Sequence, residues 1–250
     1  MDKFKTDKPV IGTWNTLGSP MVTDALASCG FDFIIIDLEH GPFVISEIHV
    51  YVNACIIYNC IPIVRVPSKE SWMFLQVLDQ GAQGVIIPGV KSKKDVLDYI
   101  SYIKYFPEGK RGYTPFSKAG KFTNRMNDSH ASRSNESVIA GIIIEDMEGI
   151  NNIDEILTID EIDVVYFGAY DLSQDLGIPG KVKDEKLLLL IKDVVKKVLE
   201  SGKRVGGFVP QNNEEIKDLL NLGMNFITFN VDSDIITFNA SEGINSFKNM

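Results

Sequence analysis

The chain of 250 residues is 44% hydrophobic and 24% charged, a composition typical of a compact protein that buries one large core. Its net charge of −9 opposes a surface that follows phosphates, so nucleic acid is excluded as an expected partner. No apolar run approaches the roughly 18 residues that a membrane span needs, and no apolar signal segment opens the chain. A cytoplasmic protein without a membrane partner is expected.

Eight short runs rich in β-branched residues follow one another along the chain. Their nearly continuous apolarity is typical of strands covered on both faces, which favours parallel pairing with helices outside. In chain order the runs are KPVIGTW (8–14), FDFIIIDL (31–38), IPIVRVP (61–67), GVIIPGV (84–90), VIAGIIIE (138–145), DVVYFGAYD (163–171), RVGGFV (204–209) and NFITFNVD (225–232).

Amphipathic segments that end at glycine separate these runs. Examples are SPMVTDALASCG (19–30), SKESWMFLQVLDQG (68–81), DEKLLLLIKDVVKKVLESG (184–202) and NNEEIKDLLNLG (212–223). Their apolar residues recur at helical spacing. Eight alternations without a break in composition predict an α/β protein with one (β/α)8 barrel over residues 1–250, in preference to a doubly wound sheet. A polar connection at 108–137 interrupts the alternation of strand-like runs and amphipathic segments. Long connections of this kind are usually functional or disordered.

The three cysteines, Cys29, Cys55 and Cys60, lie in apolar contexts that resemble helices. Their odd number and these contexts predict buried free thiols in place of disulfides or a metal cluster. Free thiols are typical of a reducing compartment.

Polar residues gather at the carboxyl ends of the runs, where a (β/α)8 barrel builds its active site. Most of the ionisable ones are therefore expected at one mouth of the barrel. Reading each run to its end gives Trp14, Asn15, Asp37, Glu39, His40, Arg65, Pro88, Glu145, Asp171 and Asp232.

Glu145 and Asp171 each place a carboxylate at the end of an apolar strand. Two carboxylates repel at close range, and a hard divalent cation such as Mg²⁺ or Mn²⁺ relieves that repulsion. The alternative is that each acid caps the helix that follows, where acids are favoured anyway. Zinc is less attractive, because His49 and His130 lack the spacing of zinc ligands.

His40 is the best candidate for proton transfer, because histidine titrates near neutral pH and Asp37 or Glu39 lies close enough to orient its ring. Arg65 lies inside an apolar strand, where an unpaired cation is costly, so it should meet a carboxylate, an anionic substrate or both. An ion pair with an acid of a neighbouring strand would be its structural alternative. The runs carry no lysine beyond Lys8, which disfavours imine chemistry.

Several motifs together make the chain similar to the HpcH/HpaI aldolases, metal-dependent class II enzymes that form or cleave pyruvate aldol adducts. The resemblance covers nearly the whole chain. It implies a barrel of the phosphoenolpyruvate/pyruvate-binding type and a homo-oligomer, usually a hexamer, which the short tail INSFKNM (244–250) also favours. The motifs are GTWNTLGSP (12–20), DFIIIDLEHGP (32–42), PIVRVP (62–67), DQGAQGVIIPGV (79–90), IIIEDMEGINNIDEI (142–156) and YFGAYDLSQDLG (166–177).

The resemblance also implies roles for the residues at the strand ends. Glu145 and Asp171 are implied as the protein ligands of Mg²⁺, Mn²⁺ or Co²⁺, with water and two oxygens of pyruvate completing the shell. His40 is implied as the acid/base with Asp37 as its orienting partner. Arg65 is implied to steady the keto oxygen as it becomes an enolate.

The candidate substrate-binding residues are Trp14, Gly168, Ala169 and Tyr170, of which the last three lie in the segment that receives the pyruvate carboxylate in the family. Two of the neighbouring positions depart from the family pattern. Ile143 stands where many members carry Gln, and Tyr170 stands where a small residue is common. Lys118 replaces a common Arg in the polar connection. These departures indicate an altered acceptor pocket.

The sequence therefore predicts a lyase that interconverts a 4-hydroxy-2-oxo acid with pyruvate and an aldehyde. One alternative is an enzyme that uses the enolate of phosphoenolpyruvate or oxaloacetate, including a decarboxylase. Another is a barrel that binds a keto acid or sugar acid without turnover.

Overall fold

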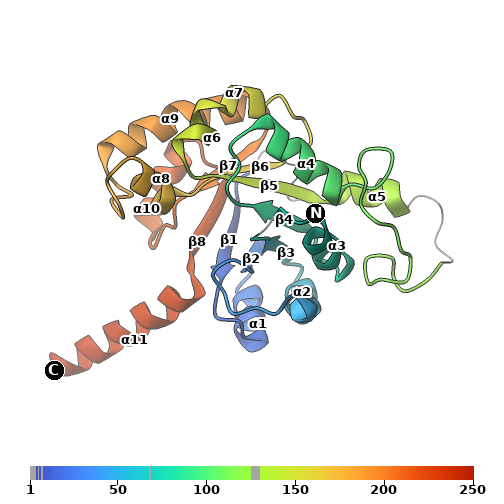
Figure 1. The fold of residues 1–250 in the computed structure, drawn as a ribbon. Helices are drawn as coiled ribbons and strands as arrows, with labels where there is room; N and C mark the ends of the chain where they lie inside the picture. Colours follow the sequence, from blue (N-terminus) through green and yellow to red (C-terminus); the bar gives the residue numbers. More distant parts are fainter. Residues whose placement is uncertain (1–3, 5, 7, 68, 125–129) are drawn as a thin grey trace.

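The computed structural model describes residues 4, 6, 8–67, 69–124 and 130–250. At its centre is a closed barrel of parallel strands, each hydrogen-bonded to the next in chain order, with β8 returning to β1 (Figure 1). The predicted (β/α)8 architecture is confirmed, and each strand falls in one predicted run, although β1 reaches one residue further. The strands are β1 (Val10–Asn15), β2 (Phe33–Asp37), β3 (Ile61–Arg65), β4 (Gly84–Ile87), β5 (Ile139–Ile144), β6 (Val164–Phe167), β7 (Arg204–Gly207) and β8 (Phe226–Val231).

Helices follow the strands, and most of them cover the outside of the barrel (Figure 1). Local sequence sets some of their ends. Ser92 and Asp95 form a reciprocal capping box at the start of α4, and the Asn212 side chain caps α10. The helices are α1 (Pro20–Ser28), the 3-10 helix η2 (Ile45–Glu47), α2 (Ile48–Ile57), α3 (Ser71–Asp79), α4 (Lys93–Ile103), α5 (His130–Ser137), α6 (Met147–Asn151), α7 (Ile153–Ile156), α8 (Ala169–Asp175), α9 (Glu185–Glu200), α10 (Asn213–Asn221) and α11 (Asp232–Lys248).

Alternate residues of the strands supply two separate apolar cores: Ile34 packs against the helices, whereas Phe33 packs inside the barrel. The rings of Phe33 and Phe226 stack with centroids 4.1 Å apart. Gly12 makes room for them, because a Cβ there would lie 2.4 Å from the Phe33 ring. Phe4 packs edge-on against both rings at 6.0 Å. Side chains therefore fill this part of the barrel.

The polar connection at 108–137 contains turns and α5, with residues 125–129 outside the described part of the chain. Its beginning is held against the barrel by an ion pair between Nη2 of Arg111 and Oδ1 of Asp79 at 2.7 Å. Further along, Nζ of Lys118 donates to Oδ1 of Asn53 on α2 at 2.5 Å. Lys118 is therefore engaged on the outside of α2 in this chain.

Cys55 and Cys60 are buried free thiols, as predicted. The prediction is wrong for Cys29, which is exposed. It is the C-cap residue of α1, where residues 28–30 are all exposed.

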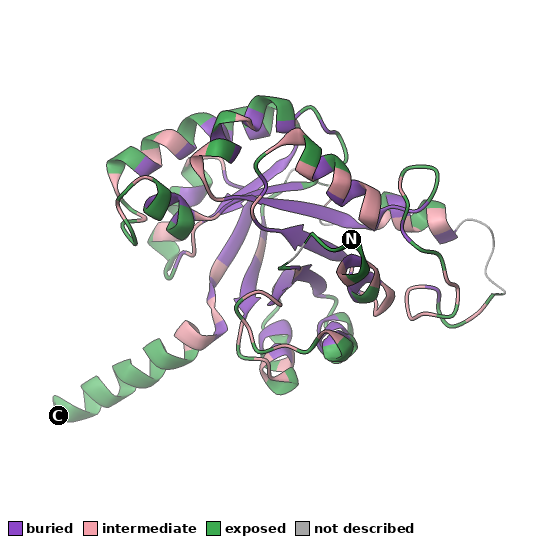
Figure 2. Cartoon of the chain, in the orientation of Figure 1, coloured by how far each residue is buried: buried purple, intermediate pink, exposed green. Residues whose placement is uncertain are grey.

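The last helix leaves the barrel. α11 begins directly after β8 and runs outward, so that the C-terminus lies at the far tip of the molecule (Figure 1). Asp232 is its buried residue, and the rest of the helix is largely exposed (Figure 2). Ile236, Phe238 and Phe247 are 51%, 59% and 77% exposed. The first five residues of the tail INSFKNM, 244–248, thus end a 17-residue helix that does not cover its own barrel.

Within the described residues, none of the helices combines the length and the apolarity that crossing a membrane requires.

Candidate active site

A cavity of about 410 Å³ opens at the carboxyl end of the barrel. Cavities of this size suit a small molecule held by a few polar groups. The structure places on its wall every residue to which the sequence assigned a catalytic, metal-binding or substrate-binding role. They are Trp14, Asp37, His40, Arg65, Glu145, Gly168, Ala169, Tyr170 and Asp171. The strand-end residues Asn15, Glu39, Pro88 and Asp232 do not line the cavity.

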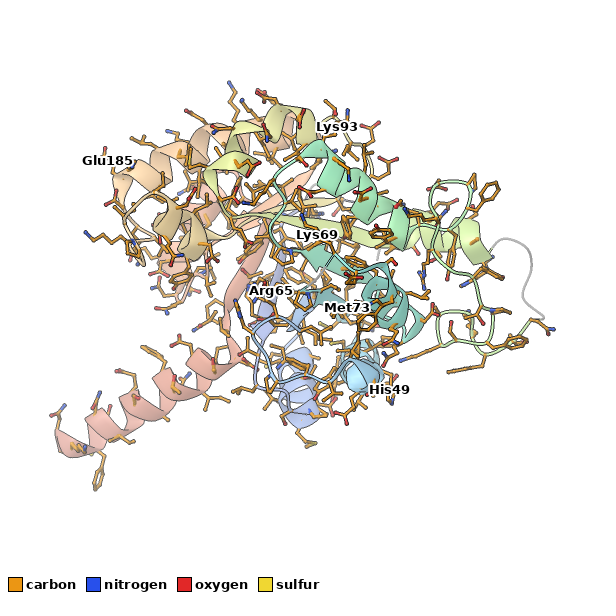
Figure 3. All side chains as sticks on the ribbon, viewed as in Figure 1. His49, Arg65, Lys69, Met73, Lys93 and Glu185 are labelled. Atoms are coloured by element: carbon orange, nitrogen blue, oxygen red, sulfur yellow. The ribbon has the colours of Figure 1, made fainter. Side chains whose placement is uncertain are left out.

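Asp37 and Arg65 form a bidentate ion pair in the cavity wall. They are direct neighbours on β2 and β3, because the register pairs their Cα positions. Nε of Arg65 donates to Oδ1 of Asp37 at 2.7 Å, and Nη2 donates to Oδ2 at 2.5 Å. This geometry fixes the plane of the guanidinium. Figure 3 labels Arg65 among the strand ends at the centre of the molecule.

Two further residues surround the guanidinium. Oε2 of Glu39 lies 3.0 Å from Nη1 of Arg65, and the Trp14 ring centroid lies 4.6 Å from Cζ. Burial opposes the charge of Arg65, but the hydrogen bond and charge of Asp37, with the charge of Glu39, outweigh it, so the pKa of Arg65 is raised. The expectation that Arg65 meets a carboxylate is confirmed.

The Asp37 carboxylate also shapes the turn that carries His40. Its Oδ1 accepts the backbone N–H of Glu39 at 3.0 Å and that of His40 at 3.3 Å. The backbone N–H of Gly41 donates to the Asp37 carbonyl at 3.0 Å. The turn expected near Glu39 is therefore present.

The structure corrects the expectation that Asp37 orients the His40 ring directly. No hydrogen bond joins the Asp37 carboxylate to that imidazole within the described residues, because both carboxylate oxygens bind Arg65. His40 is exposed at the rim of the cavity. Asp37 holds the backbone of His40, and Glu39 binds Arg65.

Glu145 and Asp171 face the same cavity from neighbouring strand ends. Glu145 directly follows β5, and Asp171 lies in the first turn of α8, whose N-cap is Gly168. A Cβ on Gly168 would lie 2.7 Å from Cβ of Glu145, so glycine is what lets the two segments pass this closely. Burial, followed by the charges of Asp171 and Glu39, raises the pKa of Glu145 to about 7. The acids therefore form an electrostatically unfavourable pair.

The donor set at this pair fits a hard divalent cation. Across the described residues, no group of three or more His, Cys, Asp or Glu side chains is placed to hold a metal. The protein would thus supply two carboxylates, and Mg²⁺ or Mn²⁺ takes its remaining ligands from water or substrate oxygens. Burial and the neighbouring acids raise the pKa of Glu145, and a cation between Glu145 and Asp171 would offset both effects.

Tyr166 closes the floor of the cavity. Its hydroxyl accepts Nε1–H of Trp14 at 3.2 Å and donates to the carbonyl of Phe208 at 2.9 Å. Burial raises the pKa of Tyr166, so the hydroxyl stays neutral. Tyr166, Phe208 and Val209 also line the cavity and were not predicted to do so from the sequence. Their places near the ends of the sixth and seventh runs were a signal that could have identified them.

Asp232 is a strand-end acid with a structural role. It is 1% exposed, and its carboxylate accepts the backbone N–H groups of Thr16 and Leu17 at 2.9 and 3.0 Å. The side chain of Asn15 donates to it at 2.7 Å. Asp232 thus fixes the loop after β1, and Thr16 of that loop lines the cavity.

The chain is similar to known proteins of one family. A model of the HpcH/HpaI aldolase/citrate lyase family matches residues 10–237. The chain belongs to this family. A hydroxypyruvate/pyruvate aldolase from Agrobacterium fabrum is 31% identical over 235 residues, which cover 92% of this chain and 88% of the relative. The resemblance inferred from the motifs is confirmed.

Solved structures agree with this membership. An HpcH/HpaI aldolase from Desulfitobacterium hafniense superimposes with a TM-score of 0.93 at 26% identity, covering 100% of this chain and 96% of that one. The citrate synthase SbnG superimposes with a TM-score of 0.88 at 28% identity, covering 99% and 96%. Because these members of the HpcH/HpaI family are named for different reactions, membership alone leaves the substrate open.

The carboxylate pair predicts a pH-dependent stability for the metal-free protein. A carboxyl group whose pKa rises on folding stabilises the folded state at low pH, and that contribution is lost as the pH rises from about 4.5 to about 7. Replacing Glu145→Gln should therefore leave stability nearly unchanged near pH 4 and raise it by about 1–2 kcal/mol near pH 8, allowing for solvent screening. Urea unfolding in the presence of a chelator measures both values.

Glu242→Gln on the exposed α11 is the matched control and should change stability at neither pH. An equal effect of Glu145→Gln at both pH values would contradict the raised pKa of Glu145.

Proposed function

We propose that the chain is a metal-dependent aldolase that interconverts a 4-hydroxy-2-oxo acid with pyruvate and an aldehyde. The observation that carries the proposal is a fixed cation, Arg65, and a pair of carboxylates, Glu145 and Asp171, on the wall of one small cavity. Cleavage of the C3–C4 bond leaves its electron pair on C3 as the enolate of pyruvate. Such a site directs positive charge to the place where this negative charge develops. The name of the Agrobacterium relative supports pyruvate as the product.

Glu145 and Asp171 would hold the divalent ion, which is Mg²⁺, Mn²⁺ or Co²⁺. When bound, such an ion supplies a Lewis acid that polarises the keto group. Lysine is absent from the described residues that line the cavity, so an imine route would lack its amine. The pyruvate part of the substrate would be held by four residues of the cavity wall, which are Trp14, Gly168, Ala169 and Tyr170.

Arg65 stabilises the keto oxygen as the C3–C4 bond breaks. Its bonds to Asp37 fix the guanidinium before substrate binds, so little reorganisation accompanies the change in charge. The Trp14 ring under the guanidinium limits its movement further. Asp37 is therefore a positioning residue, which acts through Arg65 and through the backbone of His40.

His40 removes the proton of the C4 hydroxyl, and C4 leaves as the carbonyl carbon of the aldehyde. The enolate then takes a proton at C3 and becomes pyruvate. The position of His40 at the exposed rim of the cavity allows its proton to exchange with water between turnovers.

A second candidate is an enzyme that uses the enolate of oxaloacetate or phosphoenolpyruvate, including a decarboxylase. The similarity to citrate synthase SbnG, which is named for a reaction other than pyruvate aldol cleavage, is the reason to test it. Pyruvate released from oxaloacetate with no aldehyde turnover would support this candidate. Affinity for a keto acid or sugar acid without turnover under any metal would support a binding barrel instead.

We also propose that the chain is a cytoplasmic homo-oligomer, with a hexamer favoured. The exposed apolar side chains of α11, among them Phe238 and Phe247, support self-association. Light scattering on the active protein tests this, and a fully active monomer would overturn it.

Metal dependence is the first prediction of the aldolase proposal. Chelation should abolish cleavage, and Mg²⁺, Mn²⁺ or Co²⁺ should restore it, because Glu145 and Asp171 leave the keto group unpolarised on their own. Glu145→Ala and Asp171→Ala should lose activity that no metal restores. Borohydride added with pyruvate should leave no adduct, and a reduced lysine adduct found by mass spectrometry would refute the mechanism.

The second prediction concerns His40. His40→Ala should slow aldol cleavage by roughly 10²–10⁴-fold, the usual loss for a positioned general base, while metal binding measured by calorimetry should persist. His49→Ala is the matched control, because His49 lies on α2 (Figure 3) and does not line the cavity. Near-normal cleavage by His40→Ala would remove its assigned role.

A further inference from the structure

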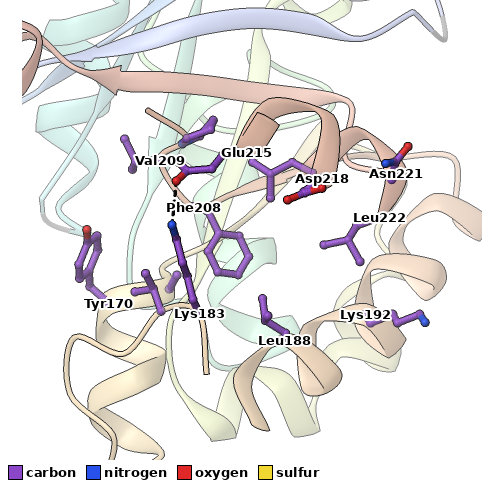
Figure 4. Close-up of a pocket in the computed structure, with 14 residues that line it drawn as sticks. Tyr170, Lys183, Leu188, Lys192, Phe208, Val209, Glu215, Asp218, Asn221 and Leu222 are labelled. Carbon is purple, nitrogen blue, oxygen red and sulfur yellow. Dashed lines mark hydrogen bonds and ion pairs between the residues drawn. The ribbon is translucent and has the colours of Figure 1, made fainter. Parts of the chain in front are cut away.

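A second cavity, of about 570 Å³, lies beside the catalytic one. We call it the side cavity. Its walls come from the segment after α8, from α9 and α10, and from the residues that follow β7 (Figure 4). Its volume is in the range of cavities that take a small ligand or a substantial part of one.

The side cavity shares a wall with the catalytic cavity. Ala169, Tyr170, Phe208 and Val209 line both. Tyr170 is 61% exposed, and Figure 4 places it at one end of the side cavity, with Leu222 at the other. These four residues are therefore what separates a ligand held by Arg65 from the side cavity.

The floor of the side cavity is apolar. Val182, Leu188, Leu219 and Leu222 are partly or fully buried there. The Phe208 ring points into the space between them (Figure 4). Apolar walls of this kind bind hydrocarbon, because each buried methylene is removed from water.

The charged residues of the side cavity do not offer a site for an ionic ligand. Nζ of Lys183 lies 2.7 Å from Oε1 of Glu215, so these two neutralise each other across the cavity (Figure 4). Oε2 of Glu215 also accepts the backbone N–H of Gln211 at 2.8 Å. Lys192 and Asp218 are exposed at the outer edge. The interior of the side cavity therefore suits a hydrocarbon chain as its ligand.

The backbone holds Phe208 in place. Its φ of 60° is in the left-handed region, which a bulky residue adopts only when its surroundings enforce it. The enforcing contacts are two hydrogen bonds to its carbonyl, from Tyr166 at 2.9 Å and from Thr228 at 3.0 Å. Tyr166 is the floor of the catalytic cavity, so one hydrogen-bond network sets the shape of both cavities.

We propose that the side cavity receives the apolar chain of the aldehyde part of the substrate, so that the preferred substrates are 4-hydroxy-2-oxo acids with an unbranched hydrocarbon tail. This inference rests on the proposed aldolase function for the position of the keto-acid end. Tyr170, Phe208 and Val209 set the passage between the two cavities and therefore determine specificity for the tail. A second carboxylate at the end of the tail would meet apolar walls and lose its hydration.

Binding of straight-chain 2-oxo acids tests the proposal without turnover. Calorimetry in the presence of Mg²⁺ measures the Kd of each member from pyruvate to 2-oxodecanoate. We expect Kd to fall by roughly two- to fourfold for each methylene that enters the side cavity, and kcat/KM for the matching aldehydes to rise in step.

Leu188→Trp fills the side cavity and should abolish this dependence on chain length while leaving the Kd of pyruvate unchanged. Leu189→Trp is the matched control, because Leu189 is 57% exposed on the same helix and does not line the cavity. If Leu188→Trp fails to fold by thermal melting, Val182→Phe in the turn after α8 fills the same space.

Binding of pyruvate with no gain from longer chains, or a gain that survives in the filled variants, would overturn the side-cavity proposal and leave the aldolase intact. If neither pyruvate nor any other 2-oxo acid binds, the proposed function itself fails.

Discussion

The site depends on one constraint, which is the need to hold a partly buried guanidinium at the mouth of an apolar barrel. Burying an unpaired cation is costly. The register of β2 and β3 places Asp37 directly beside Arg65, and this pairing offsets that cost. The bidentate pair then sets its surroundings. Trp14 packs on the guanidinium, Glu39 turns toward it, and the remaining acceptor capacity of Asp37 holds the turn that ends at His40. The positions of the cation and of the candidate base thus follow from one ion pair.

The opposite wall has the reverse electrostatic character. Arg65 is matched by Asp37 and Glu39, whereas Glu145 and Asp171 have no ion pair with a cationic side chain in the described part of the chain, and the pKa of Glu145 is raised to about 7. Unfavourable carboxylate pairs cluster at functional sites, because a bound cation relieves them. The two walls therefore suit a substrate that develops negative charge between them, as an enolate does. Beyond the shared wall, the side cavity offers hydrocarbon contacts and no free charge within its interior, so the polar and apolar ends of a substrate would be separated in space.

The sequence predicted the barrel and the composition of the site well, for a physical reason. Strands covered on both faces must be apolar throughout, so KPVIGTW and the other runs are recognisable locally, and the polar residues that end them converge because all parallel strands point the same way. What failed depends on contacts between elements. The sequence spacing of Asp37 and His40 suggested a bond between carboxylate and ring, but the register with β3 gives that carboxylate to Arg65. The outward course of α11 and the exposure of Cys29 likewise depend on packing between elements, which local sequence patterns do not record. The same holds for the wall that Phe208 and Tyr170 form between the two cavities.

The most direct test of the central claim is the exchange of the methyl protons of pyruvate with deuterated water, followed by NMR in the Asp37→Asn, Arg65→Lys and double variants with metal present. Exchange reports enolate formation alone. If Asp37 acts by fixing Arg65, each single substitution should slow exchange by roughly 10²-fold or more, and the double substitution should be little slower than either. Exchange at a near-normal rate in Asp37→Asn, or effects of the two substitutions that simply add in free energy, would contradict the account.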